Sequence, residues 1–134
     1  MSLPLNKETE WLETDGLGGF ASGTTRGLRT RRYHALLVSA TTPPTGRVAL
    51  VSGLEAWLEM EMGNFPLTSQ MYFPGVVSPN GTADIDAFDL VPWPRWTYRL
   101  PYGMTLEHEL FMPKGRSAVA LSWKLTDPRG QIKL

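Results

Sequence analysis

Glycine and proline interrupt this sequence every few residues, and that spacing limits which elements the chain can form. The sequence holds 13 glycines and 11 prolines, and dipeptides such as Pro-Gly, Asn-Gly and Lys-Gly are typical of turns. Between the turns, apolar residues recur at every second position. From Leu54 to Met62, for example, they alternate with three glutamates and Trp57. This period predicts strands, because a helix would spread the same residues around its axis.

Several further segments carry the same pattern and are separated by turn residues. Short strands at regular spacing predict an antiparallel β-sandwich, so we expect an all-β domain with almost no helix. Proline at positions 66, 92, 94 and 101 excludes a central strand at those points. The expected strands lie within residues 34–40, 48–62, 65–73, 86–93, 95–100, 104–112 and 117–125.

The length and the last residues bear on domain organisation. A chain of 134 residues suits one domain, which we place over residues 1–134. Residues 131–134 follow an Asp-Pro-Arg-Gly turn and have the character of a strand that is just beginning. We therefore expect the chain to be part of a larger domain. An unpaired strand edge there would favour self-association.

Charge and composition exclude several classes of function. Thirteen basic and thirteen acidic residues give a formal net charge of zero, so no overall positive field attracts nucleic acid or an anionic membrane. No apolar run is long enough to span a bilayer, and the first residues lack the features of a secretory signal. The absence of cysteine excludes disulfides and thiolate metal sites, and it fits a cytoplasmic protein.

Residues 16–21, Gly-Leu-Gly-Gly-Phe-Ala, match the G-x-G-x-x-(G/A) pattern of dinucleotide-binding folds. In those folds the pattern lies between a parallel strand and a helix whose N-terminus binds the pyrophosphate. Here the residues that follow are poor helix formers, and glycine recurs at Gly23 and Gly27. We therefore interpret the run as turns that need a positive φ, and we expect no cofactor.

Four arginines follow within seven residues, at Arg26, Arg29, Arg31 and Arg32. An acidic block at residues 8–15 lies just upstream, so the simplest interpretation is neutralisation between neighbouring strands. A binding surface is the alternative, because Arg31, Arg32, Tyr33 and His34 lead directly into an apolar strand on a rigid scaffold. If this segment is a strand, Arg31 and Tyr33 lie on one face and Arg32 and His34 on the other.

Glycoside hydrolysis needs two carboxylates at a defined separation. Glu107 and Glu109 share one strand face, and so do Asp84 and Asp86. Alternating charge of this kind usually marks the solvent face of a strand, and His108 would point to the opposite face. Two histidines in the whole chain give little support to a metal site, and we expect none.

Five tryptophans in a short chain fit either a large aromatic core or a surface on which sugar rings stack. The segment Pro-Trp-Pro-Arg-Trp has proline on both sides of Trp93, which keeps it irregular. We therefore expect Trp93 to be the most exposed of the five. The tryptophans are Trp11, Trp57, Trp93, Trp96 and Trp123.

The first 55 residues carry a motif that is longer than the glycine-rich pattern and the carboxylate pairs described above. It comprises E-W-L-x-T-(N/D)-G-L-G-G-(F/Y)-A-S-G-T at residues 10–24, T-R-R-Y-H-(A/G)-L-L-V at residues 30–38, P-P-x-G-R at residues 43–47, and then Leu54-Glu55. This combination resembles the opening of the bacterial and archaeal type of glycogen debranching enzyme, the amylo-α-1,6-glucosidase family. The departures are mild, with Asp15 where Asn is common, Phe20 for Tyr, and Ala35 where Gly is common.

The resemblance implies an N-terminal β-sandwich followed by an (α/α)6-barrel, which removes the single α-1,6-linked glucose at a glycogen branch. The general acid and base of the family lie in the barrel, so we expect no catalytic residue in this chain, which alone would be inactive. Its partners would be the barrel and, through the enzyme, α-glucan. The residues expected to bind glucan or the barrel are Asp15, Arg31, Arg32, Tyr33, His34 and Trp93.

Two alternatives remain open at this point. The chain could be a freestanding carbohydrate-binding module, which would need an exposed aromatic platform. It could also be a purely structural domain that touches no sugar.

Overall fold

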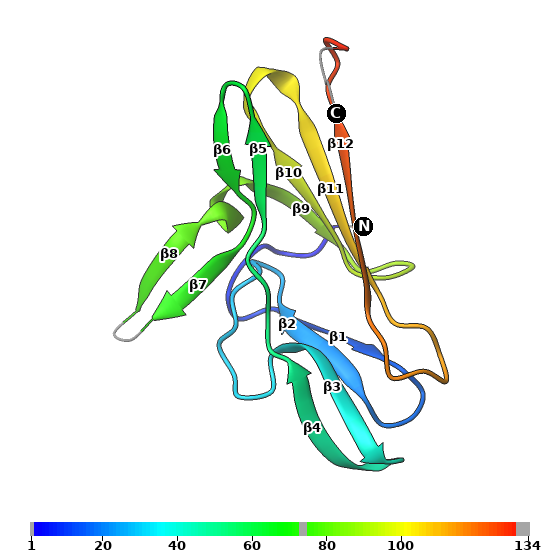
Figure 1. Cartoon of the computed structure of the whole chain (residues 1–134). Coiled ribbons are helices and arrows are strands. Elements are labelled where there is room, and N and C mark those ends of the chain that lie inside the picture. The colour runs from blue at the N-terminus through cyan, green and yellow to red at the C-terminus, as the bar shows by residue number, and fades with distance from the viewer. Residues whose placement is uncertain (1, 73–74, 131–134) are drawn as a thin grey trace.

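The computed structural model describes residues 2–72 and 75–130 (Figure 1). Within them the chain forms β-strands and two short 3-10 helices but no α-helix, so the prediction of an all-β fold is confirmed. None of these helices has the length and apolar character needed to cross a membrane. The strands are β1 Glu10–Thr14, β2 Phe20–Thr24, β3 Ala35–Thr42, β4 Thr45–Val51, β5 Trp57–Met60, β6 Gly63–Pro66, β7 Ser69–Tyr72, β8 Val76–Asn80, β9 Ile85–Asp89, β10 Arg95–Arg99, β11 Thr105–Phe111 and β12 Ala120–Thr126. The helices are η1 Gly81–Asp84 and η2 Pro101–Gly103.

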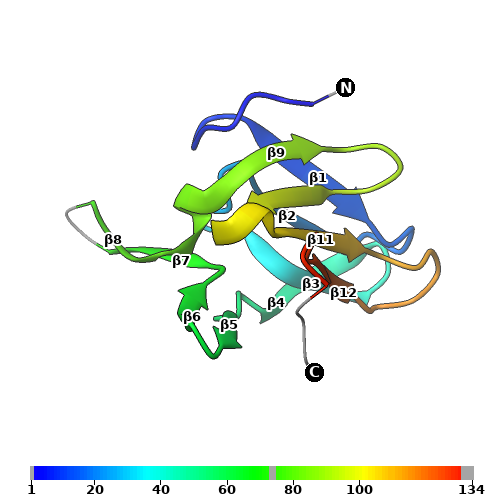
Figure 2. The same ribbon diagram turned by 90° about the horizontal axis from the view of Figure 1, so that it is seen from above.

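The described strands form two four-stranded antiparallel sheets and two hairpins. The first sheet has the order β1-β2-β3-β4 and the second the order β12-β11-β10-β9, while β5 pairs with β6 and β7 with β8. Both sheets are therefore built from strands that follow one another in the chain. Viewed from above, the second sheet lies in front of the first (Figure 2).

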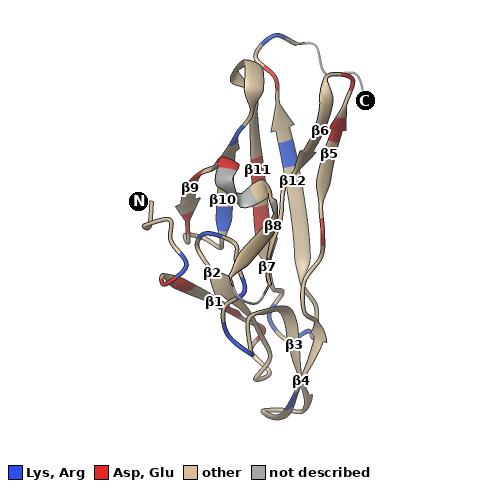
Figure 3. Ribbon diagram, turned by 90° about the vertical axis from the view of Figure 1, so that its left-hand side faces the viewer, with Lys and Arg blue, Asp and Glu red and all other residues tan. Residues whose placement is uncertain are grey.

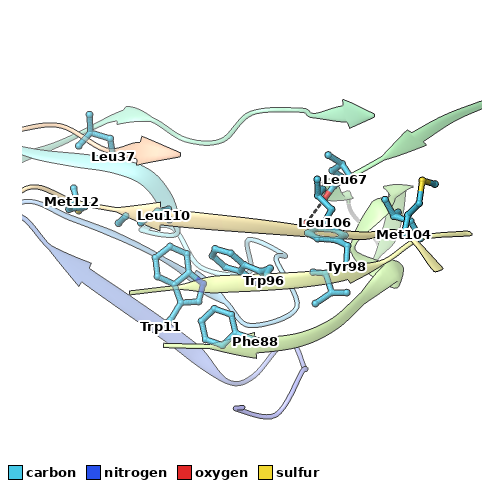
Figure 4. Close-up of a cluster of buried hydrophobic side chains, with 13 residues drawn as sticks. Trp11, Leu37, Leu67, Phe88, Trp96, Tyr98, Met104, Leu106, Leu110 and Met112 are labelled. Atoms are coloured by element: carbon cyan, nitrogen blue, oxygen red, sulfur yellow. Dashed lines mark hydrogen bonds between the residues drawn. The ribbon is translucent and has the colours of Figure 1, made fainter. Parts of the chain in front are cut away.

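Both sheets contribute to one hydrophobic core (Figure 4). Trp11 of β1 meets Trp96 of β10 nearly edge-on, with ring centroids 5.4 Å apart, and Phe88 of β9 lies 5.0 Å from Trp96. The indole N–H of Trp96 donates to the carbonyl oxygen of Thr25 at 3.0 Å, and that of Trp11 donates to Thr24 at 3.2 Å. The rings thus bury apolar surface without leaving a polar group unpaired. The two sheets pack through this shared core.

The alternation seen in the sequence after Leu54 is reproduced in the burial of the side chains. Leu54, Ala56, Leu58 and Met60 are half-buried, and the residues between them are exposed. The single strand expected over residues 48–62 is wrong in its extent, however. The chain leaves β4 at Val51 and enters β5 only at residue 57, and the intervening Ser-Gly pair belongs to neither strand.

Strands β1, β2 and β8 were not predicted. The sequence of β2, Phe-Ala-Ser-Gly-Thr, lacks the apolar alternation of a half-buried strand. The structure explains its glycine, because Gly23 pairs with Trp11 of β1 and a Cβ there would lie 3.3 Å from the indole ring. The strand expected to begin at residues 131–134 lies outside the described residues.

Candidate functional site

The glycine-rich run lies in the loop between β1 and β2, two antiparallel strands, and no helix follows it. This is not the setting of a dinucleotide-binding loop. Gly16 and Gly18 have φ values of 81° and 96°, which side chains rarely adopt and glycine adopts freely. A Cβ on Gly18 would also lie 2.5 Å from the carbonyl oxygen of Pro44. The interpretation as turns that need a positive φ is confirmed.

Asp15 begins this loop and is fully buried. Its Oδ1 accepts hydrogen bonds from the backbone N–H groups of Leu17 at 2.7 Å and Gly19 at 3.0 Å. Its own carbonyl oxygen accepts from the N–H of Gly115 at 2.7 Å. Among the described residues, Asp15 Oδ2 has no hydrogen-bond partner. Asp15 thus ties the loop to the β11–β12 connection and offers no atom to a ligand at the surface.

Residues 31–34 lead directly into the apolar strand β3, as the sequence predicted, but they form a turn and are not part of the strand. The N–H of His34 donates to the carbonyl oxygen of Arg31 at 3.1 Å, and β3 begins only at residue 35. The expected division into two strand faces, Arg31 with Tyr33 and Arg32 with His34, is therefore wrong. Because the chain turns here, the side chains of Arg31 and His34 reach the same acceptor, Glu10.

Glu10 of β1 is the centre of this cluster. Its Oε1 accepts from Arg31 Nε at 2.5 Å and from His34 Nε2 at 2.7 Å. The hydrogen bond from His34, and then the bond and charge of Arg31, lower the pKa of the Glu10 carboxyl below its usual value. Sequence reasoning named Glu10 only as a member of the acidic block. The motif at residues 10–24, which begins with this glutamate, was the signal that could have singled it out.

The buried ring of His34 has a defined tautomer. Its Nδ1 accepts from two backbone donors, the N–H groups of Thr30 at 2.9 Å and Arg31 at 3.1 Å. Since Nδ1 is an acceptor, the ring proton lies on Nε2 and is donated to Glu10. The imidazole is consequently a bridge between the turn and β1.

A surface hollow of about 270 Å³ lies over this cluster. Leu12 and Tyr33 are 56% and 57% exposed, so apolar side chains stand beside the polar group formed by Glu10, Arg31 and His34. Ser22 Oγ donates to the carbonyl oxygen of Tyr33 at 2.9 Å and holds the turn against β2. We call this site the Glu10 hollow. It is lined by Glu10, Trp11, Leu12, Ser22, Arg31, Tyr33 and His34.

The other arginines are not among the residues that line the Glu10 hollow. The guanidinium of Arg32 lies 5.6 Å from the centre of the Tyr33 ring, within the range of a cation–π contact. Arg29 donates to Gln70 Oε1 at 3.2 Å, and Arg26 donates to the carbonyl oxygen of Leu5 at 3.3 Å. Arg31 pairs with Glu10 of the acidic block, so the neutralisation hypothesis is confirmed for this arginine.

The structure does not bring Trp93 to the Glu10 hollow. Trp93 is half-buried in the β9–β10 connection, and its ring meets Phe111 at 5.1 Å. This connection and the β2–β3 loop lie on opposite sides of the molecule (Figures 1 and 2). Trp57 is more exposed, at 50%, so Trp93 is not the most exposed tryptophan as expected.

A second hollow, of about 110 Å³, opens between the two sheets. Trp123 of β12 lies on its rim, and His108 is stacked between Trp96 and Trp123 with centroid distances of 5.3 and 4.6 Å. His108 Nδ1 donates to the carbonyl oxygen of Ser122 at 3.0 Å, and burial between the rings lowers the pKa of this imidazole. We call this site the inter-sheet hollow. No Asp or Glu is among its lining residues in the described part of the chain.

Figure 3 shows where acidic residues occur along the strands of the second sheet. On β11, Glu107 and Glu109 alternate with the buried Leu106 and Leu110 and therefore point to the outer face. Glu107 lies opposite Lys124, Arg95 pairs with Asp89 at 3.5 Å, and Arg99 pairs with Asp86 at 2.9 Å. His108 faces the core, as the alternation predicted. Over residues 2–72 and 75–130, no group of three or more acidic or histidine side chains is arranged to hold a metal ion.

These features define an all-β domain of antiparallel sheets with a shared core, in which neither of the two hollows is lined by a pair of carboxylates. Comparison with family models gives one match, described as "Glycogen debranching enzyme N terminal", over residues 9–134. The chain belongs to this family, which confirms the resemblance seen in residues 10–55. No curated protein matches the chain, and no solved structure matches it.

Proposed function

We propose that this chain acts as a non-catalytic N-terminal domain of a glycogen debranching enzyme. That enzyme would be a cytoplasmic amylo-α-1,6-glucosidase, which hydrolyses the single α-1,6-linked glucose at a glycogen branch. In this proposal the domain packs on an (α/α)6-barrel of the same enzyme, and the barrel supplies the general acid and base. The family match supports the assignment to the enzyme.

The position of the carboxylates is the observation that supports a non-catalytic role for this domain. Hydrolysis of a glycosidic bond needs two carboxyl groups that flank one substrate. The inter-sheet hollow contains none, and the Glu10 hollow contains one, whose Oε1 is already shared by Arg31 and His34. Glu107 and Glu109 alternate with the inward-facing residues of β11 and line neither of these two hollows.

We propose the Glu10 hollow as the surface that meets the barrel or the glucan. Its exposed Tyr33 ring can lie against the face of a pyranose, while Arg31 and Glu10 present charged groups to hydroxyls. Asp15 is buried and would contribute indirectly, by holding the β1–β2 loop in place. Arg32 would support Tyr33, and Trp93 would contribute to a separate contact surface with Phe111.

The exposed ring of Tyr33 also favours a second candidate, a carbohydrate-binding module that holds glucan without the barrel. The two functions differ in what the isolated chain does. A module binds maltooligosaccharides in titration calorimetry, and Tyr33→Ala abolishes that binding. A domain that works only with the barrel shows no heat of binding, and neither version releases glucose from a branch-stub dextrin.

The test of the proposed function uses the debranching enzyme that contains this domain. Arg31→Ala and Tyr33→Ala should lower kcat/KM for a branch-stub dextrin by about tenfold at unchanged melting temperature. Arg29→Ala is the matched control, because Arg29 is also an exposed arginine of the β2–β3 loop but lies outside the Glu10 hollow. Unchanged kinetics for both variants, or losses that follow the melting temperature, would refute a role of the hollow in the reaction. Release of glucose by the isolated chain would refute the non-catalytic assignment.

A further inference from the structure

We propose that the Glu10 hollow binds two adjacent hydroxyl groups of one glucose unit. In this arrangement Glu10 Oε2 accepts a hydrogen bond from the first hydroxyl, and the guanidinium of Arg31 donates to the second. The assignment rests on the proposed function, because it takes glucan as the occupant of the hollow. It adds the chemical group that is recognised, and it makes Glu10 a residue that determines substrate specificity.

Glu10 uses one of its two carboxylate oxygens within the described residues. Oε1 accepts from Arg31 Nε at 2.5 Å and from His34 Nε2 at 2.7 Å, whereas no donor of the described chain is bonded to Oε2. Glu10 lines the hollow, and its side chain is partly exposed. A carboxylate has about four lone-pair sites on its two oxygens, so Oε2 is left to accept a bond from a ligand.

Arg31 has unused donors in the same place. In the part of the chain that the structure describes, its side chain makes one hydrogen bond, from Nε to Glu10, and its other bonds come from the backbone. The two Nη groups are therefore open to a ligand. A guanidinium only donates hydrogen bonds, and an ionised carboxylate only accepts them. Together the two groups complement a pair of hydroxyls, one of which donates while its neighbour accepts.

The buried ring of His34 keeps the carboxylate in one position. His34 Nδ1 accepts the N–H groups of Thr30 and Arg31 at 2.9 and 3.1 Å, so Nε2 carries the proton that is donated to Glu10. The bonds from His34 and Arg31 lower the pKa of the Glu10 carboxyl, which favours its ionised form. Glu10 is thus charged and oriented before a ligand arrives, and this reduces the entropy lost on binding.

The charges of the lining residues favour an uncharged ligand. Glu10 and Arg31 carry opposite charges and form an ion pair. His34 is neutral, because its Nδ1 is an acceptor. The residues that line the hollow therefore have no net charge, so a phosphate or carboxylate gains little from Coulomb attraction there. A sugar, which offers hydroxyls and no charge, matches these groups better.

The size and the apolar side chains of the hollow fit one pyranose ring. Its volume of about 270 Å³ is close to the roughly 300 Å³ at which small-molecule sites begin, so it admits one sugar unit and not a longer chain. The exposed side chains of Tyr33 and Leu12 offer apolar surface to the C–H groups of the ring. In glucose the hydroxyls on neighbouring ring carbons are equatorial, so they extend from the edge of a ring whose face lies against Tyr33.

The α-1,6-linked glucose of a branch is the unit that we assign to the hollow, because as a chain end it keeps its 2-, 3- and 4-hydroxyls free. The test uses the debranching enzyme that contains this domain. Its substrates are a branch-stub oligosaccharide and three analogues, in each of which one of these hydroxyls of the α-1,6-linked glucose is replaced by hydrogen. The values of kcat/KM are compared for the wild type and for variants of Glu10 and Arg31.

Glu10→Gln changes one atom of the site. Its amide oxygen has to face the donors of Arg31 and His34, so the NH2 group takes the place of Oε2 and can no longer accept a bond. The variant should lower kcat/KM by about tenfold for the parent substrate, but by less than about twofold for the one analogue that lacks the contacted hydroxyl. Arg31→Lys keeps the charge and loses the planar fork. It should show the same selective effect at the hydroxyl on the neighbouring carbon.

Glu13→Gln is the matched control, because Glu13 is the other glutamate of β1 and does not line the hollow. It should leave the kcat/KM of all four substrates unchanged. Melting temperatures confirm that each variant is folded at the assay temperature. No loss of kcat/KM in Glu10→Gln, or a loss by the same factor for all four substrates, overturns the proposal. So do selective effects of the two variants at hydroxyls that are not adjacent.

The outcome also separates this proposal from the proposed function. If Arg31→Ala and Tyr33→Ala lower kcat/KM while Glu10→Gln treats all four substrates alike, the hollow serves the reaction through a contact with the barrel. The recognition of adjacent hydroxyls is then refuted and the proposed function stands. Unchanged kinetics in every one of these variants would refute both.

Discussion

Glu10 and His34 are joined by a 2.7 Å hydrogen bond although 24 residues separate them in the chain. The same imidazole accepts the backbone N–H groups of Thr30 and Arg31 through Nδ1. One side chain thus fixes the shape of the turn and attaches it to β1. The presentation of Arg31 and Tyr33 in the Glu10 hollow depends on this ring.

His34→Ala should lower the free energy of unfolding by about 2 kcal/mol, because two partly buried backbone donors lose their acceptor together with the bond to Glu10. Arg31→Ala should cost less than about 1 kcal/mol, because its side chain is 71% exposed and its ion pair is screened by solvent. Urea denaturation of both variants measures the difference. Equal losses for the two would show that the ring does not hold the turn.

Because the pKa of Glu10 is lowered, part of the free energy of unfolding depends on pH in the acidic range. Because the pKa in the folded chain lies below the value of about 4.5 expected when unfolded, the contribution is complete above that value and is lost as the pH falls through the folded pKa. The stability difference between the wild type and Glu10→Gln should thus be constant above about pH 5.5 and shrink below about pH 4.5. Melting temperatures across this range test it. A difference that grows in acid would have the wrong sign.

The protonation of His108 should affect the stability of the chain at a higher pH than the protonation of Glu10. Burial lowers the pKa of this imidazole below its usual 6.5, so protonation favours the unfolded chain. The associated stability is present above about pH 6.5 and is lost as the pH falls toward the folded pKa. His108→Gln should remove this loss, so the melting temperatures of wild type and variant should converge or cross between about pH 7.5 and 5. Parallel curves over that range would contradict the prediction.

Gly19→Ala should lower the free energy of unfolding by about 2–3 kcal/mol through overpacking. A Cβ at this position would overlap Asp15 Oδ2 and lie 2.7 Å from the carbonyl oxygen of Val38. Gly53→Ala serves as the control, because its Cβ would lie 3.4 Å from the flexible Arg29 side chain, which can move. Thermal melts should show the control within about 0.5 kcal/mol of the wild type. Similar losses for both would point to backbone entropy and not to the contact with Asp15.

Asp15→Asn should keep or raise the stability, whereas Asp15→Ala should lower it by about 1–3 kcal/mol. Oδ1 accepts two backbone N–H groups, and an asparagine oxygen would accept them equally well. The unpaired Oδ2 would be replaced by an NH2 group near the carbonyl oxygen of Val38, since both oxygens crowd the same side of Gly19. Guanidinium denaturation gives the ranking. A large loss in Asp15→Asn would show that the charge itself stabilises the loop.

Much of the fold could be predicted because strand alternation is local. The half-burial of Leu54 and Leu58, and the inward direction of His108 between two outward glutamates, follow from backbone geometry alone. β1 and β2 were not predicted, because the local alternation of apolar residues is missing there. Gly23 interrupts the pattern of β2, and only the pairing with Trp11 across the sheet explains why glycine stands there.

The candidate site was predicted in part. Arg31, Tyr33 and His34 were named together, and the structure places them around one hollow. Their arrangement could not be predicted, because the turn is closed by contacts of the His34 ring with residues both near and far in the chain. Trp93 was assigned to the same site from its flanking prolines, which predict irregular backbone but not which side of the molecule it occupies.

The connectivity of the two sheets determines the order in which contacts can form. One sheet is drawn from residues 10–51 and the other from residues 85–126, so each is a meander of hairpins with short loops to close. Short loops keep the contact order of these pairings low, and hairpins form within microseconds. The contact between Trp11 and Trp96 spans a much longer loop and can form only when the two meanders meet. We therefore expect the docking of the two meanders to limit the folding rate, and we expect substitutions of either tryptophan to slow that step.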